Sequence, residues 1–132
     1  MHTIQQLSTM KAEHDYWQNR IKFYREEIKQ FNGNLSTVVQ QFDKPNLMPH
    51  VEHFQNQFIR QNEVLDIIRH DFKQHENLIE DLASERQKEP IEGILSIHTL
   101  QREKLEQFEK IFHELRNEFN VFLNKTEIQT AL

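Results

Sequence analysis

The sequence contains no cysteine, and it has only two glycines and three prolines among 132 residues. Without cysteine the chain can form no disulfide, has no thiol nucleophile and cannot hold zinc or iron–sulfur clusters through thiolates. So few glycines and prolines leave little turn chemistry for a many-stranded sheet, whereas the abundant Gln, Glu, Lys, Leu and Ile favour helices. These absences predict an all-α protein, and the missing disulfides suit a reducing cytoplasm.

Basic charge and long apolar runs are also scarce. The formal net charge is -5 and the pI is about 5.9, whereas nucleic-acid binding rests on clustered Lys and Arg. No segment approaches 18 consecutive apolar residues, and the first residues contain neither a basic leader nor an apolar block of signal length. The sequence therefore predicts a cytoplasmic protein that binds neither nucleic acid nor membranes.

Apolar residues recur at alternating spacings of three and four, which is the pattern of packed helices. In the first segment the pattern predicts a helix over about 9–42, with His14 filling the single gap. Asn32, Gly33 and Asn34 interrupt the composition but leave this spacing unshifted, so we expect a weak point or kink there rather than a turn. The positions are Met10, Trp17, Ile21, Tyr24, Ile28, Phe31, Leu35, Val38 and Phe42.

Two proline-containing stretches divide the rest of the chain. Pro45 and Pro49 flank Asn46, a residue that can cap a helix, and they predict a second helix over about 47–84. Pro90 follows a charged stretch and predicts a third helix over about 91–124, with residues 125–132 as a fraying tail. The apolar positions are Leu47, Val51, Phe54, Phe58, Leu65, Ile68, Phe72, Ile79 and Leu82, then Ile94, Leu105, Phe108, Phe112, Leu115, Phe119 and Phe122.

Short connections between long helices favour antiparallel neighbours. We therefore predict that residues 1–132 form one domain, an elongated antiparallel three-helix (up-down-up) bundle with coiled-coil-like packing. Further apolar residues, such as Phe23, Ile67 and Ile111, widen each stripe beyond what a narrow seam needs. Since large exposed apolar patches usually mark interfaces, we expect a homo-oligomer or a protein partner.

Each helix has one histidine inside its apolar stripe: His14, His75 and His98. Centring the first turn between Phe42 and Leu47 places residues whose numbers add to 89 side by side, which pairs His14 with His75. The same reasoning at the second turn pairs His75 with Gln101, one turn from His98. The helix register therefore predicts that the three histidines and Gln101 converge at one end of the bundle, while Gln61 fills the other polar position of the second stripe.

This histidine layer has two interpretations. Histidines and glutamine can form a hydrogen-bonded polar layer that fixes the register of otherwise similar helices. Alternatively, His14, His75 and His98 are ligands of a divalent metal such as zinc, with a fourth position open. His50 and His53 lie beside the second stripe, and two histidines without a third ligand predict only adventitious binding.

Established helical metal motifs do not occur. Di-iron bundles require a glutamate three residues before a histidine, and no histidine here has one. Hemerythrins pair ligands four residues apart on a helix, whereas His70 and His75 are five residues apart. No nucleophile elbow, phosphate-binding glycine loop or dinucleotide fingerprint is present. The numerous carboxylates alternate with Lys and Arg at helical spacing, which indicates a solvated, ion-paired surface.

The strings VEHFQNQF, near a proline-containing turn, and FEKIFHELRNEFNVFL, close to the C-terminus, together resemble a family of small uncharacterised bacterial helical-bundle proteins over most of the chain. That resemblance implies a bacterial cytosolic bundle and transfers no activity or site residue. From the residues themselves we expect a non-enzymatic bundle that acts through protein–protein interaction or self-association and needs no cofactor. The alternative is a bundle that binds a metal or small ligand at the histidine layer.

Overall fold

The computed structural model describes residues 2–42, 45–86 and 90–131, and within them the side chains from Gln5 to Thr126. In these ranges the chain is helical and has no strand. Helix α1 runs over His2–Gln41, a short 3-10 turn η1 over Pro45–Leu47, α2 over Met48–Ala83 and α3 over Ile91–Ala131. Both predicted connections include residues outside the description, 43–44 and 87–89.

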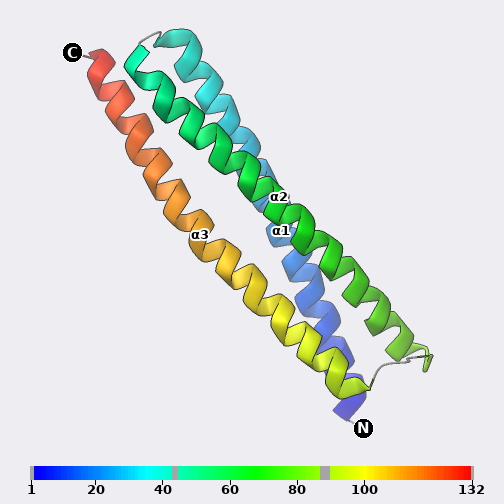
Figure 1. The fold of residues 1–132 in the computed structure, drawn as a ribbon. Helices are drawn as coiled ribbons and strands as arrows, with labels where there is room; N and C mark the ends of the chain where they lie inside the picture. The colour runs from blue at the N-terminus through cyan, green and yellow to red at the C-terminus, as the bar shows by residue number, and fades with distance from the viewer. Residues whose placement is uncertain (1, 43–44, 87–89, 132) are drawn as a thin grey trace.

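The three helices lie side by side in an elongated rod, shown in Figure 1. Helices α1 and α3 point the same way, α2 runs opposite to them, and the N-terminus lies at the end where α2 is followed by α3. This is the up-down-up bundle that the sequence predicts. Within the described ranges, none of the helices carries an apolar stretch sufficient to span a lipid bilayer.

Two helix boundaries differ from the prediction. Helix α1 begins at His2 rather than near residue 9, and α3 continues to Ala131, so the predicted fraying tail is helical wherever it is described. Leu7 packs against the small core at that end of α1. Near the end of α3, Thr126 is buried and its hydroxyl donates to the carbonyl of Phe122. Extending a formed helix needs no new nucleus, so such modest contacts lengthen it.

Two local predictions are also settled. Helix α1 continues unbroken through Asn32, Gly33 and Asn34, because Phe31 and Leu35 on either side are both buried in the core. The cap of α2 is Leu47 rather than Asn46, and no side chain caps the helix. Pro49 lies in its first turn, where a missing N–H breaks no helical hydrogen bond.

Backbone hydrogen bonds terminate α2 and begin α3. After α2, Glu85 adopts a left-handed conformation with φ of 57°, and the Arg86 N–H donates to the Asp81 carbonyl over 2.8 Å. This is a Schellman arrangement, and a glutamate occupies the position that usually holds glycine. Helix α3 starts where the Pro90 carbonyl accepts hydrogen bonds from Gly93 and Ile94.

The core consists of two apolar clusters of unequal size. The larger one extends from Trp17 and Phe72 to Phe122 and contains most of the phenylalanines. The smaller one, Met10, Ile79, Leu82 and Ile94, lies at the end where α2 gives way to α3. Along each helix, the histidine of the stripe lies between these two clusters. The histidine layer is thus a polar partition inside an otherwise apolar rod.

Ring contacts establish the register of the helices. Trp17 lies 5.0 Å from Phe72 and Phe31 lies 5.5 Å from Phe58, between ring centroids; both pairs have residue numbers that add to 89, as predicted. Between α2 and α3, Phe54 contacts both Phe119 and Phe122. One side chain therefore fits between two on the facing helix, as in coiled-coil packing.

Three arginine–glutamate pairs connect the parallel helices α1 and α3. Their members are always 89 residues apart, and successive pairs are seven residues apart along each helix. The sign alternates, since the first and third pairs take their glutamate from α1 and the second takes its arginine from α1. Such a ladder of half-buried pairs favours one axial register over neighbouring ones. The pairs are Glu13–Arg102, Arg20–Glu109 and Glu27–Arg116.

Candidate metal centre

One side chain from each helix contributes to a histidine cluster near one end of the rod. His14 of α1, His75 of α2 and His98 of α3 are 2%, 1% and 4% exposed. One ring nitrogen of each lies within 4.8 Å of one from each of the others. All three occupy core positions of their stripes, so the packing of the neighbouring apolar layers holds the imidazoles together.

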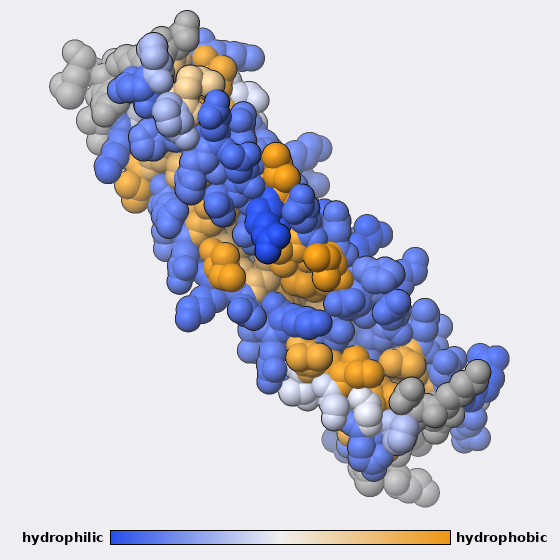
Figure 2. Space-filling view, in the orientation of Figure 1, coloured by the Kyte–Doolittle hydropathy of each residue, from blue (hydrophilic) through white to orange (hydrophobic). Residues whose placement is uncertain are grey.

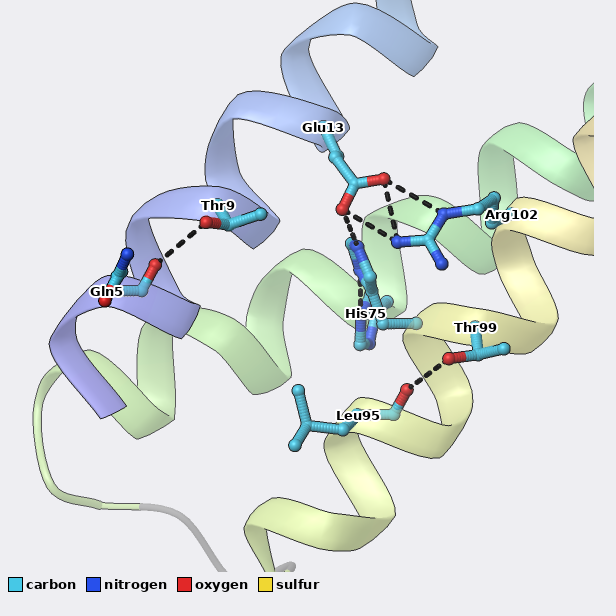
Figure 3. A network of polar contacts seen from close by, with 8 residues as sticks. Gln5, Thr9, Glu13, His75, Leu95, Thr99 and Arg102 are labelled. Atoms are coloured by element: carbon cyan, nitrogen blue, oxygen red, sulfur yellow. Dashed lines mark hydrogen bonds and ion pairs between the residues drawn. The ribbon is translucent and has the colours of Figure 1, made fainter. Parts of the chain in front are cut away.

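His98 has a defined tautomer because of its neighbours. Its Nε2 lies 3.1 Å from the Glu13 carboxylate, and its Nδ1 lies 3.1 Å from His75 Nε2. A carboxylate only accepts, so His98 donates from Nε2, and in the neutral ring Nδ1 carries the lone pair. Figure 3 shows Glu13 directed at the layer next to His75, with Arg102 on its other side. The lone pair of His98 therefore points into the cluster.

Glu13 is held firmly by Arg102. The guanidinium donates to both carboxylate oxygens over 2.8 to 3.0 Å, a bidentate geometry that is strong and directional. Partial burial raises the pKa of Glu13, but hydrogen bonds from Arg102 and His98 outweigh this and hold that pKa below its usual range. Glu13 is thus a carboxylate at neutral pH, able to orient His98 as carboxylates orient metal-bound histidines.

His14 is buried without a hydrogen bond. Neither Nδ1 nor Nε2 of its ring has a hydrogen-bond partner, and Nδ1 of His75 also lacks one. The nearest charged group is Glu76, whose carboxylate oxygen lies 3.6 Å from His14 Nδ1, beyond hydrogen-bonding distance. A buried polar group left without a partner costs about 1–3 kcal/mol. The ring therefore has unused donor and acceptor capacity inside the core.

The floor of the layer is aromatic. Trp17 stacks on His98 with centroids 4.6 Å apart and lies 5.1 Å from His14, while Phe72 lies 5.7 Å from His14. Met10, Ile79 and Ile94 belong to the apolar cluster on the opposite side. Water is thus displaced from both ends of the layer, and a low local dielectric strengthens interactions with any charge placed there.

Burial keeps the three imidazoles neutral. It is the main cause that lowers the pKa of His75 to about 4, and the charges of His14 and His98 act in the same direction. Burial also lowers the pKa of His14, against the opposite effect of Glu76, and that of His98, against the opposite effect of Glu13. Neutral imidazoles are the form that binds metals.

The donor set suits a divalent transition metal. In a tetrahedral zinc site with bonds of about 2.0–2.1 Å, the ligand nitrogens lie about 3.3 Å apart. His75 Nε2 and His98 Nδ1 are already 3.1 Å apart, and the largest separation in the trio is 4.8 Å. To bind a metal through Nε2, His75 would give up its hydrogen bond to His98 and carry its proton on Nδ1, which has no hydrogen-bond partner in the metal-free layer. Three imidazoles leave a fourth position for another ligand or water, a set that zinc, copper and nickel accept.

The other residues predicted for this region lie elsewhere or stay at its edge. Gln101 is buried and its Oε1 has no hydrogen-bond partner, yet it is His98 that contacts His75 directly. Gln61 is buried fourteen residues from His75 on α2, about 21 Å away at 1.5 Å per residue, so it belongs to a different layer. His50 and His53 are exposed and contact Phe122 and Phe54.

Sequence reasoning missed the partners of the histidines: Glu13, Arg102 and Glu76. Each lies beside an apolar stripe, where the alternation of acidic and basic residues indicates a solvated, ion-paired surface. One signal was present, since Glu13–Arg102, Arg20–Glu109 and Glu27–Arg116 share one offset of 89 and alternate in sign. It becomes visible only after α1 and α3 are known to be parallel neighbours.

Comparison of the chain with protein-family models, with curated proteins and with solved structures gives no match. The resemblance to small bacterial helical-bundle proteins therefore stays a prediction.

Proposed function

We propose that this protein binds a divalent transition metal, with zinc as the first candidate, through His14, His75 and His98. The observation that carries the proposal is His14, an imidazole 2% exposed with no hydrogen bond at either nitrogen, beside two further imidazoles within 4.8 Å. A metal would use a lone pair that nothing else in the described structure uses.

A purely hydrogen-bonded layer accounts less well for these contacts. The network includes His75, His98, Glu13 and Arg102, but it leaves His14 out. A layer that served only to fix the helix register would be more stable with an apolar residue at position 14, since an unpaired buried imidazole costs free energy. The proposed role is binding rather than catalysis. We also propose a cytoplasmic location, because a chain without cysteine gains no stabilising disulfides from an oxidising compartment.

Zinc should stabilise the folded protein, prepared without a histidine tag. A ligand that binds only the folded state at one hundred times its dissociation constant adds about 2.7 kcal/mol to the free energy of unfolding. We expect this gain in the wild type and in His53→Ala, whose histidine is exposed, and its loss in His75→Ala. Denaturant unfolding with and without zinc measures it. Equal stabilisation of His75→Ala and wild type would contradict the proposal.

The single tryptophan provides a direct reading of the same site. Trp17 stacks on His98 at 4.6 Å, so Co²⁺ or Cu²⁺ bound by the trio should quench its fluorescence at this short range. Titration should reach an end point at one ion per chain in wild type and His53→Ala. Fluorescence that stays unchanged while metal analysis finds bound ions would place those ions on surface histidines instead.

Self-association is a second candidate function, and an apolar groove between α2 and α3 favours it. The groove has a volume of about 730 Å³, and Val64, Ile67, Ile68, Phe108 and Ile111 are among the residues that line it. Ile67 is 62% exposed and Ile111 45%. Figure 2 shows apolar side chains gathered near the middle of the rod on the face where α2 and α3 are in front. Such surface favours a second helix laid along the groove.

We expect the protein to form a dimer in which this groove is covered by a second copy. Light scattering at micromolar concentrations should give twice the chain mass for wild type, and Ile67→Glu should shift the mass toward the monomer because it places a charge in the interface. Ile59→Glu is the matched control, since Ile59 is 58% exposed on the same helix and does not line the groove. A monomeric wild type would remove this candidate.

A further inference from the structure

We propose that the cleft between α1 and α2 beside His14 is the route by which the metal reaches the layer, and that Glu76 is the carboxylate that receives the cation and orients His14. This inference rests on the proposed metal binding and adds a specific residue and a specific path to it.

The cleft has a volume of about 290 Å³ and is lined by Lys11, His14, Asp15, Glu76, Ile79 and Glu80. It is open to solvent at one side, and its inner wall includes the buried ring of His14, whose nitrogens have no hydrogen-bond partner. On the other side of α1, between α1 and α3, a second cleft includes Glu13, His98 and Arg102. There the Glu13–Arg102 ion pair stands beside His98, so a cation would meet a guanidinium.

The charge of the first cleft favours a cation. Asp15, Glu76 and Glu80 contribute three carboxylates against the single ammonium of Lys11. Clefts lined by one sign of charge raise the local concentration of counter-ions and their association rates. The cleft also offers such a cation a ligand, because the buried ring of His14 at its inner wall has no hydrogen-bond partner.

Glu76 connects the solvent with the layer. Its side chain is 41% exposed, yet one carboxylate oxygen lies 3.6 Å from His14 Nδ1 and accepts a long hydrogen bond of 3.3 Å from the Gln18 amide. In the described part of the chain no lysine or arginine forms an ion pair with it. Glu76 is therefore free to bind a hydrated cation at the mouth of the cleft, which the arginine-bound Glu13 is not.

After the metal has entered, Glu76 would act on His14 as Glu13 acts on His98. A carboxylate that accepts from Nδ1–H leaves the Nε2 lone pair for the metal, fixes the ring orientation and raises its basicity. A rotation that shortens the present 3.6 Å to hydrogen-bond distance would complete this contact. The two carboxylates would then orient two of the three ligands, Glu76 from the cleft between α1 and α2 and Glu13 from the cleft between α1 and α3.

The test is stopped-flow binding of Co²⁺ to the intact protein, read by quenching of Trp17. We expect Glu76→Gln to bind at least about tenfold more weakly, as losses of such orienting partners do, with a slower association and a faster dissociation. Glu80→Gln removes the same charge from the same cleft without contact to His14, so it should slow association slightly at low salt and leave dissociation unchanged. Glu76→Asp keeps the charge in the cleft, but its shorter side chain moves the carboxylate away from His14. Association should therefore be nearly normal and dissociation fast.

The outcomes separate the two proposals. If the wild type neither binds Co²⁺ with quenching of Trp17 nor gains stability from Zn²⁺, the proposed metal binding is wrong, and this inference fails with it. If the wild type binds and Glu76→Gln matches it in both rate constants, the metal site stands and the role of Glu76 and the cleft is overturned. Equal losses in Glu76→Gln and Glu80→Gln would assign the effect to cleft charge alone and would also refute the orienting role. Circular dichroism confirms that each variant is helical before binding is measured.

Discussion

Replacing Phe58 or Phe112 by alanine is expected to lower the free energy of unfolding by about 3 to 5 kcal/mol, the usual cost of deleting a buried phenylalanine. Both side chains are fully buried. Phe58 of α2 contacts the rings of Phe31 in α1 and Phe119 in α3, so its removal would weaken the packing of all three helices. In a long thin rod there is little second layer that could collapse into the cavity.

The matched control is Glu52→Ala, on the same helix as Phe58 and exposed. It should change stability by no more than about 0.5 kcal/mol, as surface substitutions usually do. Denaturant midpoints at constant slope measure all three variants. Similar losses at Phe58, Phe112 and Glu52 would mean that the helix register described above is wrong.

The metal-free protein should lose stability as the pH falls from about 6.5 toward 4. His14, His75 and His98 all have folded-state pKa values below that of an ordinary histidine, and burial brings that of His75 to about 4. Within this window the unfolded chain binds more protons than the folded one, so the free energy of unfolding rises with pH. Each histidine that stays neutral in the folded protein contributes a slope of at most about 1.4 kcal/mol per pH unit. The stabilising contribution is complete above about pH 6.5.

Urea unfolding at several pH values checks this prediction. His75→Gln should lose part of the slope, because one depressed titration is removed, whereas His53→Gln should keep it, because His53 is exposed. Glu13 adds a separate dependence at lower pH, since its folded-state pKa is below the usual value and its contribution disappears as that carboxylate becomes protonated. A stability that is flat between pH 4.5 and 6.5 would show that the imidazoles are not buried as neutral groups.

Much of the architecture follows from local patterns. Alternating spacings of three and four define the buried stripe of each helix, because only residues on one face of an α-helix can reach a common core. The prolines at 45, 49 and 90 mark places where a preceding helix cannot continue but a new helix can begin. Helix ends were predicted less well at His2 and Ala131, since they depend on weak contacts such as those of Leu7 and Thr126.

The candidate site was partly accessible in the same way. A histidine within an apolar stripe is unusual, and antiparallel geometry alone brings His14 beside His75, which lie 4.9 Å apart between ring centroids. The partners of these rings were not accessible, because residues beside a stripe look the same in sequence whether they face solvent or a neighbouring helix. Glu13 and Glu76 are examples, because each contacts a histidine of a neighbouring helix.

By itself the sequence therefore determined that the chain is an all-α, cysteine-free, acidic bundle with one histidine in each stripe, since composition and periodicity are properties of single helices. Only the tertiary structure decided that His98 rather than Gln101 meets His75, that Glu13 is fixed by Arg102, and that His14 is left without a hydrogen bond beside an acidic cleft. These features depend on the axial offset and rotation of one helix against another. A shift of about 1.5 Å per residue along the helix axis changes which side chains meet, and many packed layers together, rather than any local motif, set that offset.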